Sequence, residues 1–296
     1  MEFNKIFKTL RYFFESLAVR FGLFLFRILG LKNAANFASF LSRKIGKKHS
    51  TNELARKNIK LSMPYFTDEK IENILDDMWD NLGRIIGEFI FVSKFSKEKL
   101  MNYIVLNEES KRNIENIKQN FHGGIIFSGH IGNWEIGPKT FLANGINVKT
   151  VYRPLNNETV DQLTSQIRGV EMIAKSSRGN KQIIEELKKG NYVIILADQK
   201  ITDGIPVPFF GRDAITTTSF AKLAIKYKVP LIPARSIRIG KNFKFEVKVE
   251  KPLEFKRSDN VEEMTKDLTL KINQKLEEWI KEYPAQWFWV HNRWKK

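Results

Sequence analysis

The chain of 296 residues contains no cysteine and only four histidines. The lack of cysteine excludes disulfide bonds, thiolate metal sites and a cysteine acyl-enzyme. Four histidines without a His-x3-His pair leave too few close ligands for a metal, although Asp198 can in principle join His130 and Glu135. The sequence therefore predicts neither a metal site nor a bound cofactor.

A long uninterrupted apolar run is also missing. A membrane-spanning helix needs about 20 apolar residues, and a charge at its centre costs about 2.5–3.5 kcal/mol. The most apolar window, residues 12–31, contains Glu15, Arg20 and Arg27. No apolar region leads to a small-residue cleavage site, so no signal peptide is predicted. Internal repeats, low-complexity tracts and Pro/Gly/Ser-rich linkers are absent from the sequence.

Positive charge is abundant and concentrated near the N-terminus. The chain carries a formal charge of +17, and residues 1–60 hold thirteen Lys and Arg against three Glu. This imbalance indicates an anionic partner. Nucleic acid is not expected to be that partner, because the sequence contains no recognisable RNA- or DNA-binding module.

Apolar residues interleave with these N-terminal cations at alternating spacings of four and three, a pattern typical of an amphipathic helix. The stripe consists of Phe3, Phe7, Leu10, Phe14, Leu17, Phe21, Phe24 and Ile28. Such a stripe packs either against a protein core or against a membrane surface. Nine of the 23 phenylalanines fall within the first 40 residues, beside cations, which favours a helix lying in the membrane interface.

Two regions of different architecture are predicted, residues 1–100 and residues 101–296. Helical periodicity dominates the first, and strand patterns are nearly absent from it. In the second, short apolar runs alternate with helical segments, which predicts an α/β fold with helices layered on both faces of a sheet. The runs are residues 124–128, 148–152, 192–197, 231–239 and 243–249, with helices at 134–143, 181–189, 219–227 and 261–283. The last two runs, joined by Gly240-Lys-Asn, read as a hairpin, so the sheet is predicted to be mixed and mostly parallel.

A histidine and a carboxylate five residues apart follow the first of these runs, in the segment His130-Ile-Gly-Asn-Trp-Glu135. On a continuous helix the two side chains would lie roughly 140° apart, so they converge only if His130 sits on the turn and Glu135 in the first helical turn. The alternative is that His130 caps or packs at an ordinary turn. Ser128 is close by, but Ile126 stands where a nucleophile elbow has glycine, which disfavours a Ser-His hydrolase.

An ordered series of motifs accompanies this segment: Val151-Tyr-Arg-Pro154, Arg168, Ala197-Asp-Gln199, Val207-Pro-Phe-Phe-Gly-Arg-Asp213, Pro230-Leu-Ile-Pro233 and Gln286-Trp-Phe-Trp-Val-His-Asn-Arg293. The series resembles the late acyltransferases of lipid A biosynthesis, the lauroyl and myristoyl transferases. The resemblance covers most of the chain and implies a glycerolipid acyltransferase-like fold. Glycerolipid acyltransferases in general usually carry His-x4-Asp, whereas Glu135 matches the lipid A branch. Mycobacterial acyltransferases of phosphatidylinositol mannosides look similar too.

The resemblance implies a reaction: transfer of an acyl chain from acyl carrier protein, or from acyl-coenzyme A, to a hydroxyl of a Kdo-bearing, tetra-acylated lipid A precursor. His130 would be the general base and Glu135 its partner, fixing the tautomer and stabilising the imidazolium. The alternatives are an acyltransferase of a lysophospholipid or phosphatidylinositol mannoside, and a non-catalytic lipid-binding protein. The family also implies the bacterial inner membrane, with the active site on the cytoplasmic side and an interfacial or single spanning N-terminal helix.

Four further residues are candidates for catalysis or substrate binding. Arg168 and Asp198 match family positions associated with activity: Arg168 can neutralise an oxyanion or a phosphate, and Asp198 can orient Arg168 or hold the acceptor. Arg153 follows a strand and suits a phosphate or carboxylate, or else shapes the turn before Pro154. Arg212, with Thr216 to Thr218 ahead of a helix, suits a phosphorylated sugar or a phosphopantetheine arm, although threonine capping is the commoner reason for such hydroxyls.

Overall fold

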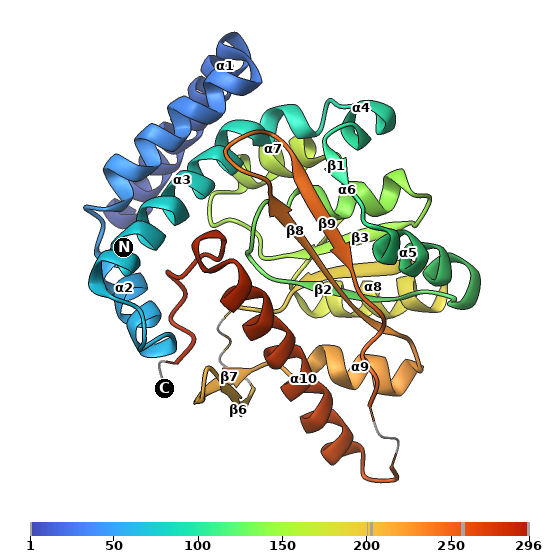
Figure 1. Ribbon diagram of the computed structural model, residues 1–296. Helices are drawn as coiled ribbons and strands as arrows, with labels where there is room; N and C mark the ends of the chain where they lie inside the picture. The colour runs from blue at the N-terminus through green and yellow to red at the C-terminus, as the bar shows by residue number, and fades with distance from the viewer. Residues whose placement is uncertain (1, 200, 202–203, 256–257, 295–296) are drawn as a thin grey trace.

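The computed structural model describes residues 2–199, 201, 204–255 and 258–294, with side chains from residue 6 onward. Its centre is a seven-stranded sheet in the order β1-β9-β8-β2-β5-β3-β4 (Figure 1). Strands β2 (Gly124–Ser128), β3 (Val148–Tyr152), β4 (Met172–Ala174), β5 (Tyr192–Leu196) and β8 (Leu231–Arg238) run parallel. Strand β9 (Phe245–Val249) is antiparallel to β8, and β1 (Ile104–Val105) is parallel to β9. The mixed, mostly parallel α/β sheet is thus confirmed.

Both faces of the sheet are buried, because alternate residues of its central strands contribute to two separate cores. Ile125 and Phe127 of β2 face one core, which includes side chains of α8 (Ser177–Lys188), α9 (Ser219–Tyr227) and α10 (Val261–Glu282). Ile126 faces the other core, formed with α5 (Glu108–Asn120) and α6 (Ile136–Ala143). Period-two burial on both faces explains why the strands read as continuous apolar runs.

Several of the observed elements were not predicted from the sequence. The antiparallel pair β6 (Ile205–Phe209) and β7 (Arg212–Thr216) was not anticipated, because the two prolines of β6 disfavour a strand assignment. Strands β1 and β4 are two and three residues long, too short to show a period. Helix α7 (Glu158–Arg168) was not predicted either, and none of its residues is buried.

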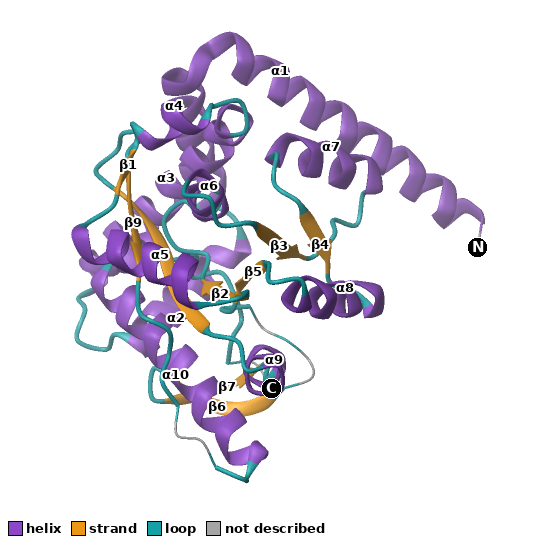
Figure 2. Ribbon diagram, turned by 90° about the vertical axis from the view of Figure 1, so that its right-hand side faces the viewer, coloured by secondary structure: helices purple, strands orange, loops and turns teal. Residues whose placement is uncertain are grey.

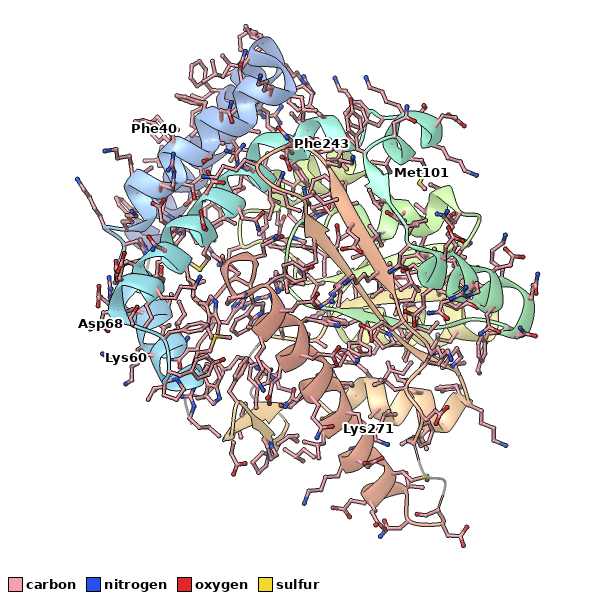
Figure 3. The ribbon with its side chains drawn as sticks, in the orientation of Figure 1. Phe40, Lys60, Asp68, Met101, Phe243 and Lys271 are labelled. Atoms are coloured by element: carbon pink, nitrogen blue, oxygen red, sulfur yellow. The ribbon has the colours of Figure 1, made fainter. Side chains whose placement is uncertain are left out.

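Helix α1 (Glu2–Gly46) is the longest element and bends at Gly30, whose φ of 71° is non-helical. The predicted stripe from Phe7 to Ile28 is exposed, each member by more than half of its area, while the side chain of Phe3 lies outside the described part. Phe40, on the outer side of the same helix, is also exposed (Figure 3). Across the described residues, we find no helix with the length and apolarity required to span a bilayer.

Helices α2 (Ser50–Ser62) and α3 (Asp68–Val92) share a core with the sheet, whereas α4 (Lys97–Met101) is a short connection. The division of the chain at residue 100 stays a prediction. A buried ion pair joins α3 to β8: the Glu88 carboxylate accepts two hydrogen bonds from the Arg238 guanidinium at 2.6 and 2.8 Å. Asn133 donates to Glu88 at 3.0 Å, and Asn81 accepts from Arg238 at 3.0 Å. This network ties α3 to the loop that carries His130.

Candidate active site

Several of the predicted residues follow parallel strands and therefore gather at one edge of the sheet. His130 comes after β2 and Asp198 after β5, and these strands are hydrogen-bonded neighbours. Arg153 comes after β3 and Lys175 after β4, which are also paired. Parallel strands have their carboxyl ends at the same edge, where α/β sheets bind their ligands.

His130 and Asp198 form the closest contact of the site. The ring Nδ1 of His130 lies 2.8 Å from Asp198 Oδ1, and the backbone N–H of His130 donates to Asp198 Oδ2 at 2.6 Å. Trp287 donates its indole N–H to the same Oδ2 at 2.8 Å. Since a carboxylate only accepts, this arrangement places the proton on Nδ1 and leaves Nε2 unprotonated, with its lone pair as an acceptor.

The Asp198 carboxylate is fully buried, with no exposed area. Burial by itself would raise the pKa of Asp198, but attraction to His130 and the hydrogen bonds from its ring and backbone lower the pKa well below its usual range. Asp198 is therefore ionised at neutral pH. Burial lowers the pKa of the adjacent His291 to about 4, against the attraction of Asp198, so His291 is neutral there.

The hydrogen-bond partner of His130 differs from the one inferred from the His-x4-Glu spacing. Glu135 is the N-cap residue of α6, and its carboxylate accepts hydrogen bonds from Arg168 Nε at 3.0–3.1 Å and from Arg168 Nη2 at 3.1 Å. The turn after β2 directs the two side chains to different partners, and Asp198, 68 residues further along the chain, takes the place against Nδ1. Asp198 therefore contacts His130 and not Arg168, the residue that one hypothesis from the sequence paired with it.

The loop that presents His130 is held by backbone hydrogen bonds to distant segments. Gly132 N–H donates to Gln286 O at 3.0 Å, and Asn81 Nδ2 donates to Gly132 O at 2.9 Å. Gly132 has a φ of +59°, and a Cβ at this position would come within 1.7 Å of the Ser236 carbonyl oxygen. Only glycine fits there, because both the backbone conformation and the close approach exclude a side chain.

A cavity of about 560 Å³ opens beside His130. Its polar side includes Glu135, Arg168 and Gln199, whose amide nitrogen lies 3.4 Å from His130 Nε2. The rest is mainly apolar and comes from α1, α3 and the strands, with Val19, Leu23, Phe26, Ile85, Phe89 and Leu196 among the lining residues. Helix α1 passes over α7 above this region (Figure 2), and Asn157 at the start of α7 donates a hydrogen bond to the Tyr12 carbonyl at 2.8 Å.

The candidate cations have different positions. Arg153 and Arg168 both line the cavity. Arg212 is not among the residues that line it: its guanidinium lies 3.9 Å from the Trp294 ring centroid and donates to Ser62 at 3.0 Å. Helix α9 begins at Ser219, and Thr218 makes no side-chain cap. Stacking on the C-terminal aromatic segment, which the sequence could not place, explains the position of Arg212.

The C-terminal motif, residues 286–293, packs against the residues that form the site. Trp287 and Trp289 have no exposed area, and Trp287 contacts Asp198 directly, so both belong to the protein core. Arg293 is also buried; it donates to the Gln199 carbonyl at 2.9 Å, and burial lowers its pKa to about 10. Sequence reasoning assigned no site role to Trp287, Gln199 or Lys175. The position of Gln199 after a predicted strand was an available signal, whereas Lys175 follows β4, which the sequence did not predict.

Among the residues that the structure describes, no group of three or more histidines and carboxylates is arranged to hold a metal ion. A histidine held by a buried carboxylate, at the polar side of an apolar cavity on an α/β sheet, defines an enzyme site for a hydrocarbon-bearing substrate. The family model described as bacterial lipid A biosynthesis acyltransferase matches residues 1–296, and the chain belongs to that family. It is therefore an acyltransferase of lipid A biosynthesis.

Individual relatives are similar at modest identity. The chain is 25% identical over 251 residues to the lipid A biosynthesis acyltransferase of Haemophilus influenzae, which covers 80% of this chain and 73% of that protein. It is 21% identical over 246 residues to the lipid A biosynthesis palmitoleoyltransferase of Escherichia coli, covering 82% of this chain and 78% of that protein. A Shigella flexneri lipid A biosynthesis acyltransferase matches to the same extent.

Proposed function

We propose that this protein transfers a fatty acyl chain from the thioester of acyl carrier protein to a hydroxyl of a Kdo-bearing, tetra-acylated lipid A precursor. The observation that carries the proposal is the orientation of His130. Asp198 occupies Nδ1 at 2.8 Å, while the ring lines an apolar cavity of about 560 Å³. A neutral imidazole in this orientation is a general base beside a space for a hydrocarbon chain.

The reaction follows from this geometry as a direct displacement. His130 Nε2 takes the proton of the acceptor hydroxyl as its oxygen attacks the thioester carbon. The carbonyl oxygen becomes an oxyanion, and Asp198 stabilises the imidazolium formed in the same step. When the tetrahedral intermediate collapses, the carbon–sulfur bond breaks and the imidazolium returns its proton to the leaving thiolate. The products are the acyl ester and the free carrier thiol.

Arg168 is our candidate for stabilising the oxyanion. Its Nε and Nη2 donate to Glu135, which fixes the plane of the guanidinium, and no hydrogen bond engages Nη1 within the described chain. The side chain lines the same cavity as His130. The guanidinium is thus fixed in one orientation, and the N–H groups of Nη1 are available to donate to the carbonyl oxygen on which negative charge develops. In this proposal Glu135 acts through Arg168 rather than through His130.

We further propose that the protein works at the surface of the bacterial inner membrane, from the cytoplasmic side. The exposed stripe of α1 stands among cations, a combination that binds anionic lipid surfaces. The opposite side of this helix, with Val19, Leu23 and Phe26, lines the cavity. A helix that contacts lipid on one side and the cavity on the other gives membrane substrates a short path to His130. The basic surface also complements acyl carrier protein, which is acidic.

Replacing Phe14 and Phe21 together by serine is expected to weaken binding to phosphatidylglycerol vesicles by at least about tenfold, because each buried phenylalanine contributes about 1.5–3 kcal/mol. Both rings are more than 60% exposed, so the fold should survive. Vesicle flotation measures the effect, and Tyr65→Ser, at a 70% exposed site outside the stripe, is the control. Equal binding of the double variant and the wild type would show that the stripe does not contact the membrane.

The transfer reaction itself is tested with purified protein, acyl carrier protein charged with saturated chains of different lengths, and the tetra-acylated acceptor. Mass spectrometry should detect an acceptor heavier by one acyl group. Modification of a lysophospholipid or a phosphatidylinositol mannoside instead would assign a different acceptor. If none of these acceptors is modified while the protein still binds lipid, the result would favour a non-catalytic lipid-binding protein.

Gly22 is expected to influence which acyl chain is preferred. It lies inside α1 and lines the cavity, and a Cβ there would meet no atom within 4 Å. Glycine inside a helix costs about 1 kcal/mol relative to alanine, so its presence is consistent with a need for open space. Gly22→Leu should lower kcat/KM for the longest accepted chain by about tenfold. The leucine side chain would displace about two methylene groups of the acyl chain from the cavity, and the burial of each methylene contributes about 0.8 kcal/mol.

The assay compares chains that differ by two carbons, and a chain shorter by two carbons should react as well as before with Gly22→Leu. Gly137→Leu is the matched control, since Gly137 is also helical, also has open space at Cβ, and does not line the cavity. A uniform loss over all chain lengths would mean that Gly22 affects the fold rather than the length of the cavity.

A further inference from the structure

Two cations at the cavity are not paired with a carboxylate in the part of the chain that the structure describes. Arg153 and Lys175 both line the cavity, and no ion pair or hydrogen bond engages either side chain within the described residues. Of the other charged groups there, Glu135 binds Arg168, and the Asp198 carboxylate, which lies against the neutral His130 ring, offsets one of the two cations. The cavity therefore carries an excess positive charge that an anionic group would compensate.

The backbone holds these two cations next to each other. Strands β3 and β4 are parallel with Tyr152 opposite Ala174, and the N–H of Lys175 donates to the Tyr152 carbonyl at 2.8 Å. Arg153 and Lys175 are the next residues of the two strands. Neighbouring strands lie about 4.8 Å apart, so a guanidinium and an ammonium can contact different oxygens of one phosphoryl group.

Other carboxylates on the neighbouring segments bind partners other than Arg153 and Lys175. Asp161 accepts hydrogen bonds from Leu155 N–H at 2.8 Å and from the Tyr152 hydroxyl at 3.0 Å. Glu171 and Glu186 pair with Lys149, a cation on β3 away from the cavity, at 2.7 and 3.2 Å. Lys149 on β3 is thus paired, whereas Arg153, which follows the same strand at the cavity, has no paired carboxylate among the described residues.

The local electrostatics agree with a site for an anion. Loss of hydration lowers the pKa of Lys175; Asp198 opposes this shift, and the Arg153 guanidinium adds to it. An anion bound between the two cations would relieve their repulsion. Helix α8 begins just after Lys175 and has no acidic residue in its first turn, so the positive end of its dipole adds to the field.

We propose that Arg153 and Lys175 together bind a phosphoryl group of one of the two substrates at the mouth of the cavity. This inference deepens the proposed transferase function and rests on it. Both residues keep part of their area exposed to solvent, so the phosphoryl group stays hydrated at the opening while the hydrocarbon enters the apolar interior. The phosphoryl group belongs either to the glycolipid acceptor or to the phosphopantetheine arm of the donor, because both substrates carry one.

Kinetics with matched substrates test the site and identify the source of the phosphate. Lys175→Ala and Arg153→Ala are each expected to raise KM about tenfold, with kcat unchanged, only for the substrate whose phosphoryl group is bound. The acceptor arm compares the phosphorylated glycolipid with its dephosphorylated form. The donor arm compares acyl-phosphopantetheine with acyl-pantetheine. Lys175→Arg should restore most of the affinity, and Lys181→Ala, which alters an exposed lysine of α8 outside the cavity, should change nothing.

A binding measurement separates this inference from the reaction itself. Calorimetry with submicellar dodecyl phosphate should give a Kd about tenfold higher for Lys175→Ala than for wild type, whereas neutral dodecyl maltoside should bind both equally. This difference would support the site even if no acyl transfer were found. An equal loss with phosphorylated and dephosphorylated ligands, or no loss with either, would overturn the proposal.

Discussion

Replacement of His130 by alanine should lower acyl transfer by about 10²–10⁴-fold, the usual contribution of a general base. His130 is the only histidine that both lines the cavity and has its Nδ1 held by a carboxylate among the described residues. Without the imidazole, water is left to accept the proton of the attacking hydroxyl. The effect should appear in kcat, because the apolar walls that bind the chain are unchanged.

The control for this variant is His122→Ala. His122 is exposed and precedes β2, so it lies at the opposite end of the strand that delivers His130. It should retain wild-type activity. Thermal unfolding of both variants checks the fold, since His130→Ala removes one partner of the buried Asp198 carboxylate. Full activity in a folded His130→Ala protein would exclude the proposed base.

Asp198→Asn should lower kcat by about 10³–10⁴-fold, because it places the His130 proton on the wrong nitrogen. Oδ2 of Asp198 accepts two N–H donors, from the His130 backbone and from Trp287, whereas Oδ1 faces only the ring Nδ1. The asparagine oxygen would keep the two donors, so its amide would point at Nδ1. That nitrogen then becomes the acceptor, and the proton moves to Nε2, where the base must be free.

Trp287→Phe distinguishes this tautomer effect from a general weakening of the site. It removes one donor to Asp198 but leaves both contacts with His130, so the expected loss of activity is less than tenfold. Rate measurements across pH, together with NMR of the His130 ring nitrogens, follow the tautomer directly. Comparable activity of Asp198→Asn and Trp287→Phe would contradict the orienting role of Asp198.

The fold could be predicted where a segment's own pattern reflects its surroundings. A strand covered on both sides must be apolar at successive positions, which is why residues 124–128 and 148–152 were predicted with the bounds that β2 and β3 have. Short strands such as β4 have too few residues to show a period, and the prolines of β6 mask its pairing with β7. These elements depend on partners elsewhere in the chain.

The candidate site was predictable as a set of residues but not as a set of contacts. The order of motifs identified His130, Glu135, Arg168 and Asp198, and the strand-end positions indicated that several of them meet at one edge of the sheet. Their roles in catalysis remain predictions. The pairing was different from the one that the spacing suggested, because Asp198 reaches His130 from a neighbouring strand and Glu135 turns to Arg168.

Periodicity and residue type, which are properties of short segments, were sufficient to predict the α/β class and the apolar N-terminal stripe and to name candidate residues for the site. Contacts between distant segments established which carboxylate lies against His130, where Arg212 lies, and that Arg153 and Lys175 follow adjacent strands with no carboxylate paired to either among the described residues. The physical reason is that hydrogen bonds and ion pairs depend on distances of about 3 Å. Such distances between side chains far apart in the chain are set by strand order and helix packing.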